Sequence, residues 1–526
     1  MQADWIYRIQ KSTPTAAKKF FQSLSTQGTK ILKRCGWRNM AGIIIGFGIV
    51  LRLIPYLDNR SLWLDEVWLA LNILQKPFSQ LMEPLDWRQI APVGFLFIEK
   101  ALVLNIGGSE YALRVFPLLA GILSLFLFYG VARRILTPRG LVIALGLFAI
   151  SELLLRYSSE LKQYSSDVTI ALGIYLLGLI CIEKESRFVL SLLLFSFAGA
   201  ILIWFSHPAV FSLAGVGIAL TLYCLKNQKW QHMAWLSMPA SLWLGSFAFN
   251  FHFAHLHLSE NVKMVKSWSG STAFMPLAPH SIQNLMWYPK AFLNMFFSPG
   301  GFEFYGLAAF CFVIGWVSAF SGKRYACYMV TFPILVTLFA SGLHMYPFQG
   351  RLILFIVPTM MIFIGEGVDR VMALEKPNGW IVWGSLLVLL FLNPIHKSMS
   401  ILLNPSRLER EEVRPVLAYL SQNYQTGDKL YLYHSSEAAF LYYAKRFNLE
   451  KHPYLLGVAS KKNWDNYINE LRGLRGNDRV WILFSHVHNS DGINEESFFI
   501  HVLDEIGKQI ASFKQQGASV YLYNLR

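Results

Sequence analysis

Long runs of apolar residues, separated by short polar segments, fill most of the chain between residues 39 and 396. A helix needs about 20 consecutive, mostly apolar residues to cross the hydrocarbon core of a bilayer. Eleven segments satisfy this requirement, and we predict that each is a membrane-spanning helix. They are residues 39–57, 111–132, 140–157, 166–182, 188–206, 208–225, 232–252, 302–320, 325–343, 352–372 and 379–396.

One apolar run, PVGFLFIEKALVLNI at 92–106, is shorter and contains Glu99 and Lys100. The excess of Lys and Arg in cytoplasmic loops decides how to interpret it. If 92–106 is not a span and the N-terminus is cytoplasmic, every basic residue in the later short loops is cytoplasmic too. These residues are Arg133, Arg134, Arg139, Lys184, Arg187, Lys226, Lys229, Lys323, Arg324, Arg370 and Lys376. We therefore predict that 92–106 is an amphipathic helix on the outer surface and that the C-terminus lies outside.

This threading brings four polar stretches to the outer face. The first is the loop at 58–110, which contains Asp65 and Glu66 and for which we predict two interfacial helices, 66–75 and 92–106. The other three are RYSSELKQYSSD at 156–167, the segment 252–270, and LHMYPFQGR at 343–351. Residues far apart in the sequence could therefore form one site.

The pattern changes at about residue 405, where apolar runs give way to alternating helix and strand signals. EEVRPVLAYLSQNY, EAAFLYYAKRF and EESFFIHVLDEIGKQI are typical of helices, whereas DKLYLYH, DRVWILFSH and ASVYLYNL are typical of strands. We predict a small α/β domain at 405–526. It has no Gly-rich phosphate loop and no nucleophile motif, so we expect an accessory role in substrate recognition, docking or stability.

Composition agrees with a polytopic membrane protein of three parts. The chain is 54% hydrophobic and 15% charged, with a mean hydropathy of +0.38. Its net charge of +15 comes from a basic N-terminal segment, residues 1–38, and from the short loops of the membrane domain, 39–396. No basic groove with interleaved aromatic residues is evident, which argues against a nucleic-acid partner. The five cysteines imply no disulfide framework.

Acidic residues at the membrane edge are the best candidates for chemistry, because two adjacent carboxylates there are costly to dehydrate. Transfer of a sugar from a lipid phosphate needs a carboxylate base for the acceptor hydroxyl. It also needs a cation to stabilise the leaving phosphate. The outer stretches supply both kinds of group. They are Asp65, Glu66, Glu160, Lys162 and Arg351.

Three stretches carry a resemblance to a known family. LWLDEVWLALNI at 62–73, with the run from APVGFLFIEKALVLN to YGVARRIL, resembles the N-terminal module of GT-C membrane glycosyltransferases. YSSELKQYSSDV resembles a second signature of a bacterial branch, and GRLILFIVP begins a late span, as in the family. The closest group is the glycosyltransferase family 39-like enzymes, which include protein O-mannosyltransferases and lipid A aminoarabinose transferase. The resemblance covers roughly residues 40–370.

The resemblance implies a sugar donor linked to a polyprenyl phosphate and inverting transfer on the outer face of a bacterial plasma membrane. It implies that Asp65 is the catalytic base and that Glu66 orients it or contacts the acceptor. By the same resemblance, Glu160 is the second acid of the site and Tyr164 lines the sugar pocket. The phosphate would be bound by Lys162 and Arg351.

Histidines on the outer side invite a metal site. His252, His255, His257 and Glu260 have ligand-forming side chains, but histidines at i, i+3 and i+5 do not share one helical face. We expect acceptor contact or interfacial packing for His255. His344 either faces a cavity on the outer side or packs against neighbouring side chains. Whether the carboxylates hold a divalent cation stays open.

Simpler interpretations compete with catalysis. Asp65 would be a helix cap, Glu160 and Lys162 a surface ion pair, and Arg351 an interfacial anchor. A transporter or flippase of lipid-linked saccharides is an alternative function, as is a non-catalytic membrane assembly subunit. Both alternatives predict that Asp65→Asn is tolerated. The sugar and the acceptor, whether glycan, lipid or protein, stay open.

Overall fold

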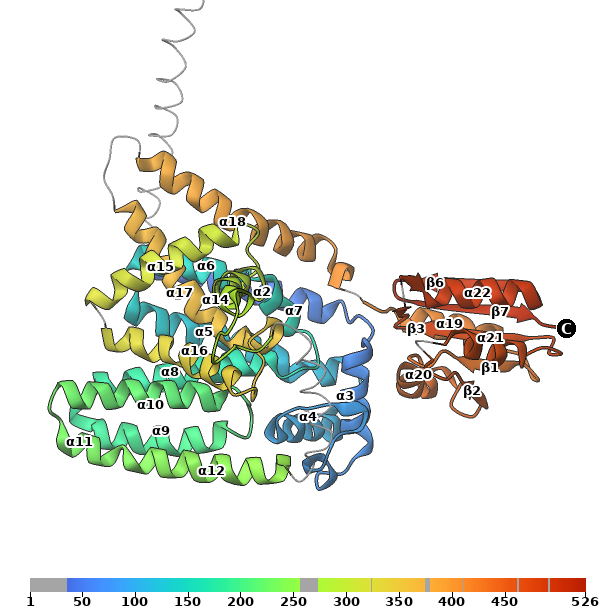
Figure 1. Cartoon of the computed structure of the whole chain (residues 1–526), viewed down its shortest axis with the longest axis horizontal. Coiled ribbons are helices and arrows are strands. Elements are labelled where there is room, and N and C mark those ends of the chain that lie inside the picture. The colour runs from blue at the N-terminus through green and yellow to red at the C-terminus, as the bar shows by residue number, and fades with distance from the viewer. Residues whose placement is uncertain are drawn as a thin grey trace, which may run out of the picture.

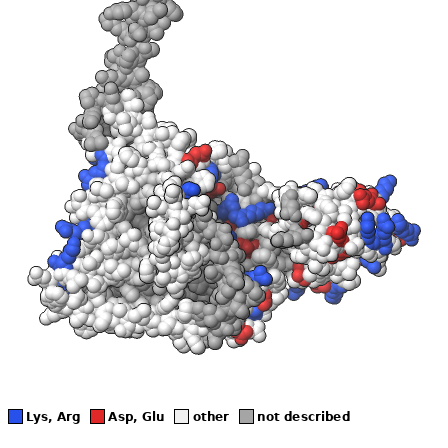
Figure 2. All heavy atoms as spheres, in the orientation of Figure 1, with Lys and Arg blue, Asp and Glu red and all other residues white. Residues whose placement is uncertain are grey.

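Two parts of unequal size make up the protein, a large helical part and a smaller α/β part attached beside it (Figure 1). The computed structural model describes residues 36–255, 273–322, 324–373, 379–408, 410–460, 463–490 and 492–526. Few charged side chains interrupt the visible surface of the helical part, whereas charges of both signs cover the α/β part (Figure 2). This contrast is expected when one part lies in lipid and the other in water.

Nine helical segments of the described residues are long and apolar enough to cross a membrane, so the chain is a multi-pass membrane protein. The helices that form them are α2 (Gly36–Leu57), α5 (Glu110–Ile135), α8 (Tyr164–Glu183), α9 (Phe188–Leu202) with η3 (Glu185–Arg187), α10 (Ala209–Lys226), α15 (Tyr305–Gly322), α16 (Arg324–Gly342), α17 (Val357–Met372) with η4 (Gly350–Ile356), and α18 (Gly379–Leu403). Each corresponds to one of the eleven predicted spans.

The predicted span at 140–157 is not one continuous helix, because two helices occupy it. α6 (Pro138–Ala149) ends after 12 residues, and α7 (Glu152–Tyr157) follows after a break. A 12-residue helix rises about 18 Å, which is too short for the hydrocarbon core. Arg52 of α2 is fully buried and donates to the carbonyl oxygen of Ala149 at 3.2 Å. A buried cation from another helix thus satisfies the end of α6.

The predicted span at 232–252 is likewise occupied by two helices. α11 (Trp230–Trp235) is followed by α12 (Ser237–His255), which is long enough to span but is less apolar than the nine. Serine, asparagine and histidine residues lower its hydropathy. α14 (Ile282–Phe297) lies after it in the chain and is shorter.

The centre of the helical part is α17, which is buried along most of its length, from Val357 to Asp369. It packs closely against α15, where Gly367 faces the backbone of Cys311 and Gly315 faces that of Phe363. A side chain at either glycine would collide with the opposite carbonyl oxygen. Small residues permit such close approach of helices in a membrane.

The segment between α2 and α5 folds over one end of the helical part. It contains α3 (Leu64–Gln75), η1 (Gln80–Met82), η2 (Asp86–Arg88) and α4 (Val93–Ile106). The two predicted helices, 66–75 and 92–106, are therefore present, and α4 is not among the nine spans. Val67 and Leu71 of α3 pack against Phe95 of α4 in a separate apolar cluster.

The C-terminal part is a five-stranded sheet with helices on both faces. Its strand order is β2–β1–β3–β7–β6, parallel from β2 to β3 and antiparallel beyond. The strands are β1 (Lys429–Leu432), β2 (Tyr454–Leu456), β3 (Val480–Ser485), β6 (Lys508–Gln515) and β7 (Ala518–Asn524), and a small pair is formed by β4 (Asn489–Ser490) and β5 (Ile493–Asn494). The helices are η5 (Pro405–Leu408), α19 (Val413–Asn423), α20 (Glu437–Tyr443), η6 (Ala444–Phe447), α21 (Trp464–Arg472) and α22 (Glu495–Ile506).

Alternating apolar residues of the strands supply two cores, one on each face of the sheet. Leu430, Trp481 and Leu522 pack on the face covered by α19 and α20. Tyr431 and Ile482 pack on the opposite face with residues of α21 and α22. The predicted alternation of helix and strand is confirmed, but β2, α21 and β6 were not predicted, and the helix predicted to residue 510 ends at Ile506.

Candidate active site

Asp65 and Glu66 lie in the first turn of α3, where the helix dipole favours negative charge. The N-cap residue is Trp63, in an extended conformation, so the interpretation of Asp65 as the cap is wrong. The Glu66 carboxylate instead accepts from the backbone N–H of Trp63 at 3.4 Å. The two acids are neighbours in sequence, but their side chains point into different surroundings.

Glu66 is fully buried and tied to three segments. Arg114 of α5 binds it with two hydrogen bonds, from Nε to Oε1 at 2.9 Å and from Nη2 to Oε2 at 2.7 Å. The backbone N–H of Leu161 donates to it at 2.7 Å. Burial opposes its ionisation, but the charge and hydrogen bonds of Arg114 outweigh burial and lower the pKa of Glu66. Its oxygen atoms are therefore occupied in holding the loop together.

Asp65 is paired with Arg351, which comes from η4, far along the sequence from α3. Asp65 Oδ2 and Arg351 Nη1 are 2.9 Å apart, and the side chains are 18% and 33% exposed. The guanidinium of Arg351 also lies 5.5 Å from the ring centre of Tyr164, at the start of α8. The pair is consequently accessible to a ligand, unlike the pair formed by Glu66 and Arg114.

Glu160 and Lys162 lie beside this pair on the turn that precedes α8. Glu160 accepts from the indole N–H of Trp63 at 3.0 Å, and burial followed by repulsion from Glu66 raises its pKa. Lys162 donates to Gln89 Oε1 at 2.7 Å, and burial lowers its pKa to about 8. Both side chains are buried, which contradicts the interpretation of the two as a surface ion pair. Asp65, Glu66, Glu160, Lys162 and Arg351 are called the Asp65 cluster below.

Further arginines surround the cluster, and sequence reasoning missed them. Arg60 is buried, donates to the Ser159 hydroxyl and carbonyl oxygens at 3.0 and 2.8 Å, and has its pKa lowered to about 10 by burial. The Arg410 guanidinium stacks 3.9 Å from the ring centre of Trp63. Arg60 and Arg156 stand within the quoted polar stretches and could have been noticed. Arg410 could not, because only the fold brings the C-terminal part to Trp63.

The two predicted histidines have different outcomes. His344 stacks on Phe274 with ring centres 4.9 Å apart, and in the described part of the chain no contact of the Asp65 cluster involves it. The side chain of His255, and the residues His257 and Glu260, lie outside what the structure describes. Among described residues, no group of three or more His, Cys, Asp or Glu side chains is placed to hold a metal ion.

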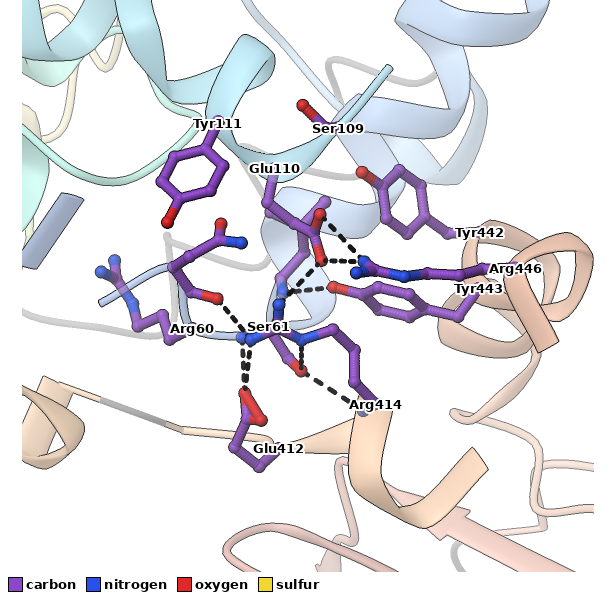
Figure 3. A network of polar contacts seen from close by, with 12 residues as sticks. Arg60, Ser61, Ser109, Glu110, Tyr111, Glu412, Arg414, Tyr442, Tyr443 and Arg446 are labelled. Carbon is purple, nitrogen blue, oxygen red and sulfur yellow. Dashed lines mark hydrogen bonds and ion pairs between the residues drawn. The ribbon is translucent and has the colours of Figure 1, made fainter. Parts of the chain in front are cut away.

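The C-terminal part is docked directly onto the segment that carries Asp65 (Figure 3). Tyr443 accepts from the backbone N–H of Leu62 at 2.8 Å, and Glu412 accepts from that of Ser61 at 2.5 Å. Arg414 and Arg446 both pair with Glu110 at the start of α5, at 3.3 and 3.2 Å. These contacts hold the residues just before α3 against both parts of the protein.

The fold and the cluster define a multi-pass membrane protein with acids and cations gathered between its helices and a C-terminal α/β domain. This architecture is GT-C-like, and nine helical segments of the described residues are long and apolar enough to cross a membrane. No protein-family model and no curated protein matches the sequence.

The structure is similar to several solved structures. ArnT from Cupriavidus metallidurans bound to undecaprenyl phosphate is similar at 12% identity and a TM-score of 0.54, covering 91% of this chain and 98% of that chain. Its apo state gives 12% identity, the same coverages and a TM-score of 0.53. The Archaeoglobus fulgidus oligosaccharyltransferase tethered with an acceptor peptide has 11% identity and a TM-score of 0.49, covering 94% of this chain and 74% of that chain. At 12% identity, the likeness to the two ArnT structures shows the fold alone.

Proposed function

We propose that the protein is a membrane glycosyltransferase that moves a sugar from a polyprenyl-phosphate donor to a hydroxyl acceptor. The observation that carries the proposal is the accessible pair of Asp65 and Arg351 within a cluster of buried charges. A base and a phosphate-binding cation are thereby adjacent, as the reaction requires. ArnT, which shares the fold, was solved with undecaprenyl phosphate, and this supports the class of donor.

The donor phosphate binds to Arg351 and Lys162. Lys162 is a buried cation whose charged form is disfavoured by burial, so a phosphate beside it restores favourable electrostatics. Arg351 pairs with Asp65 when no donor is bound, and the arriving phosphate competes for its guanidinium. Donor binding in this way frees the Asp65 carboxylate for the acceptor.

Asp65 then acts as the general base. The acceptor oxygen attacks the anomeric carbon, its proton passes to the Asp65 carboxylate, and the bond from that carbon to the phosphate oxygen breaks with its electron pair. The leaving polyprenyl phosphate keeps its negative charge beside Arg351 and Lys162. A single displacement of this kind inverts the anomeric centre.

The other members of the cluster support this arrangement. Glu160, held by the indole of Trp63, is the second acid of the site, and Tyr164 lines the sugar pocket beneath Arg351. Glu66 positions Asp65 and does not take part in proton transfer, because its oxygens are already bound. His255 and His344 stay predictions as substrate contacts.

The site faces the extracytoplasmic side of a bacterial plasma membrane in this proposal. α5 runs from Glu110, next to the docking contacts, to a basic end at Arg133 and Arg134. Arg139 follows at the start of α6 and pairs with Asp369 of α17. By the positive-inside rule this end is cytoplasmic, so the Asp65 cluster and the C-terminal domain are outside.

The first experiment compares wild type with Asp65→Asn in a transfer assay. Purified protein in lipid would be given a panel of labelled undecaprenyl-phosphate sugars with a mixed acceptor extract, with and without a chelator. We expect a loss of about 10²–10⁴-fold in turnover, which is the contribution of a general base. Asp86→Asn is the matched control, because Asp86 lies in the same segment but is 57% exposed and pairs with Lys76 on the surface.

Two results would contradict the proposal. Turnover that is the same in Asp65→Asn and wild type would remove Asp65 from catalysis. Movement of a lipid-linked saccharide across vesicles, without release of free polyprenyl phosphate, would favour the transporter instead.

A further inference from the structure

A pocket of about 780 Å³ lies between the C-terminal sheet and Trp63. This volume falls within the range of about 300–1,000 Å³ that is usual for small-molecule sites. Apart from Trp63, its walls come from the start of α22, the hairpin of β6 and β7, the residues that follow β3, and the segment around Arg410. Its polar lining includes Arg410, Glu411, His486, Glu496, Ser497 and Lys514.

The walls of this pocket are held in place by backbone contacts. The turn between β6 and β7 packs on the segment that carries Arg410, and the backbone N–H of Glu412 donates to the Gln516 carbonyl at 2.8 Å. Gly517, at the turn, has a φ of 66°, and any Cβ there would collide with the Arg410 carbonyl oxygen. The pocket is therefore lined by the same turn that contacts the segment around Arg410.

The chemistry of the pocket differs from that of the Asp65 cluster. Its two permanent cations, Arg410 and Lys514, are balanced by two carboxylates, Glu411 and Glu496. Leaving Arg410 aside, the Asp65 cluster with Arg60, Arg114 and Arg156 has five cations against three carboxylates. An anionic phosphate is therefore favoured at the cluster, and an uncharged ligand is favoured in the pocket.

The polar groups of the pocket are of the kinds that bind hydroxyls. Glu496 already accepts from the hydroxyls of Ser519 and Tyr521, each at 2.6 Å. Glu411 Oε1 lies 2.5 Å from His486 Nδ1, while its buried Oε2 has no hydrogen-bond partner among the described residues. Glu496 thus already accepts hydrogen bonds of the kind that a ligand hydroxyl would donate.

We propose that this pocket binds a neutral saccharide of the acceptor. Trp63 forms one wall and donates its indole N–H to Glu160, so a bound saccharide is separated from the Asp65 cluster by a single side chain. This inference rests on the proposed function and names the class of acceptor, a glycan whose non-reacting sugar units occupy the pocket.

The test measures saccharide binding separately from turnover. Saturation-transfer NMR would be recorded on the full-length protein in nanodiscs with cellotriose, chitotriose, mannotriose and a serine-containing hexapeptide. We expect a trisaccharide to bind wild type and Asp65→Asn equally. Ser497→Trp, which fills the pocket from an exposed position, should abolish this binding, and Lys514→Ala should weaken it by about tenfold, as expected for a lost charged hydrogen bond.

Matched controls lie on the same sheet but outside the pocket. Ser512→Trp and Lys508→Ala are exposed positions of β6 and should leave binding unchanged. The inference is overturned if no trisaccharide binds, if Ser497→Trp binds as well as wild type, or if only the hexapeptide binds and Ser497→Trp displaces it. Binding that survives while Asp65→Asn retains turnover would contradict the proposed function and leave the pocket standing.

Discussion

Two acid–arginine pairs start from adjacent residues of α3, and their surroundings are opposite. Glu66 and Arg114 are enclosed, with every contact directed at holding α3, α5 and the turn at Leu161 together. Asp65 and Arg351 are 18% and 33% exposed, and Arg351 also lies over the ring of Tyr164. The same pair of residue types thus serves as an internal clamp in one place and as an open, exchangeable contact in the other. Burial and the number of bonded partners, rather than residue type, separate the two roles.

The largest effect should come from breaking the enclosed pair. Glu66→Gln leaves Arg114 as a buried, uncompensated charge, and such a loss costs about 3–5 kcal/mol. We expect a large drop in the thermal midpoint of the protein in detergent, measured by intrinsic fluorescence. Asp65→Asn is the matched neighbour and should melt within a few degrees of wild type. Equal melting of both variants would remove the distinction between the pairs.

The open pair should respond in binding rather than in stability. Arg351→Ala removes the guanidinium proposed to hold the donor phosphate, and we expect KM for the donor to rise about 10–100-fold, as for loss of a charge-assisted contact. Arg134→Ala, which removes an arginine paired with Glu183 at a partly exposed position, is the control and should leave KM unchanged. An unchanged donor KM in Arg351→Ala would assign the pair a structural role like that of Glu66.

Nine of the eleven predicted spans correspond to single helices that are long and apolar enough to cross a membrane, because lipid demands a composition that is local in the sequence. The other two predicted spans are each occupied by two helices, for non-local or marginal reasons. α6 ends at Ala149, whose carbonyl oxygen accepts a hydrogen bond from Arg52 of α2. α12 is less apolar than the nine helical segments. In the C-terminal domain β6 was missed because the apolar pattern of α22 was extended past Gly507, where the strand begins.

The site was predictable only in part, for the same reason. Asp65, Glu160, Lys162 and Arg351 are exceptional polar residues near apolar runs, and the fold brings them together. Arg114 looks like an ordinary residue of a spanning helix until its contact with Glu66 is seen. Arg410 belongs to a different part of the chain, and only the docking of that part places it on Trp63.

A pH profile sharpens the comparison, because Lys162 beside the open pair titrates near neutrality. Its pKa is lowered from 10.5 to about 8, so its charge is lost as pH rises through about 8. We expect kcat/KM for the donor to fall above about pH 8, and Lys162→Arg should move this fall to higher pH because arginine stays charged. The sign for stability is opposite. Between about 8 and 10.5 the unfolded state binds more protons, so this residue's penalty to stability decreases with rising pH.

A profile of Lys162→Arg that coincides with wild type would assign the alkaline fall to another group. The readout is steady-state turnover over pH 6–10 with the donor below KM, since kcat/KM reports the free enzyme. Unfolding at the same pH values separates loss of charge from loss of fold.

The smallest effect on stability should come from removing an exposed contact between the C-terminal domain and α5. Arg446 pairs with Glu110 at 3.2 Å, but its side chain is 55% exposed, whereas Arg414 is 20% exposed and also donates to Ser61 at 3.1 Å. Exposed pairs contribute about 0.2–1 kcal/mol, so Arg446→Ala should lower stability by no more than that. Arg414→Ala should lower it further and also reduce turnover, because it loosens the residues just before α3. Equal and small effects of both, measured by thermal unfolding and by transfer, would mean that docking of the C-terminal domain does not position Asp65.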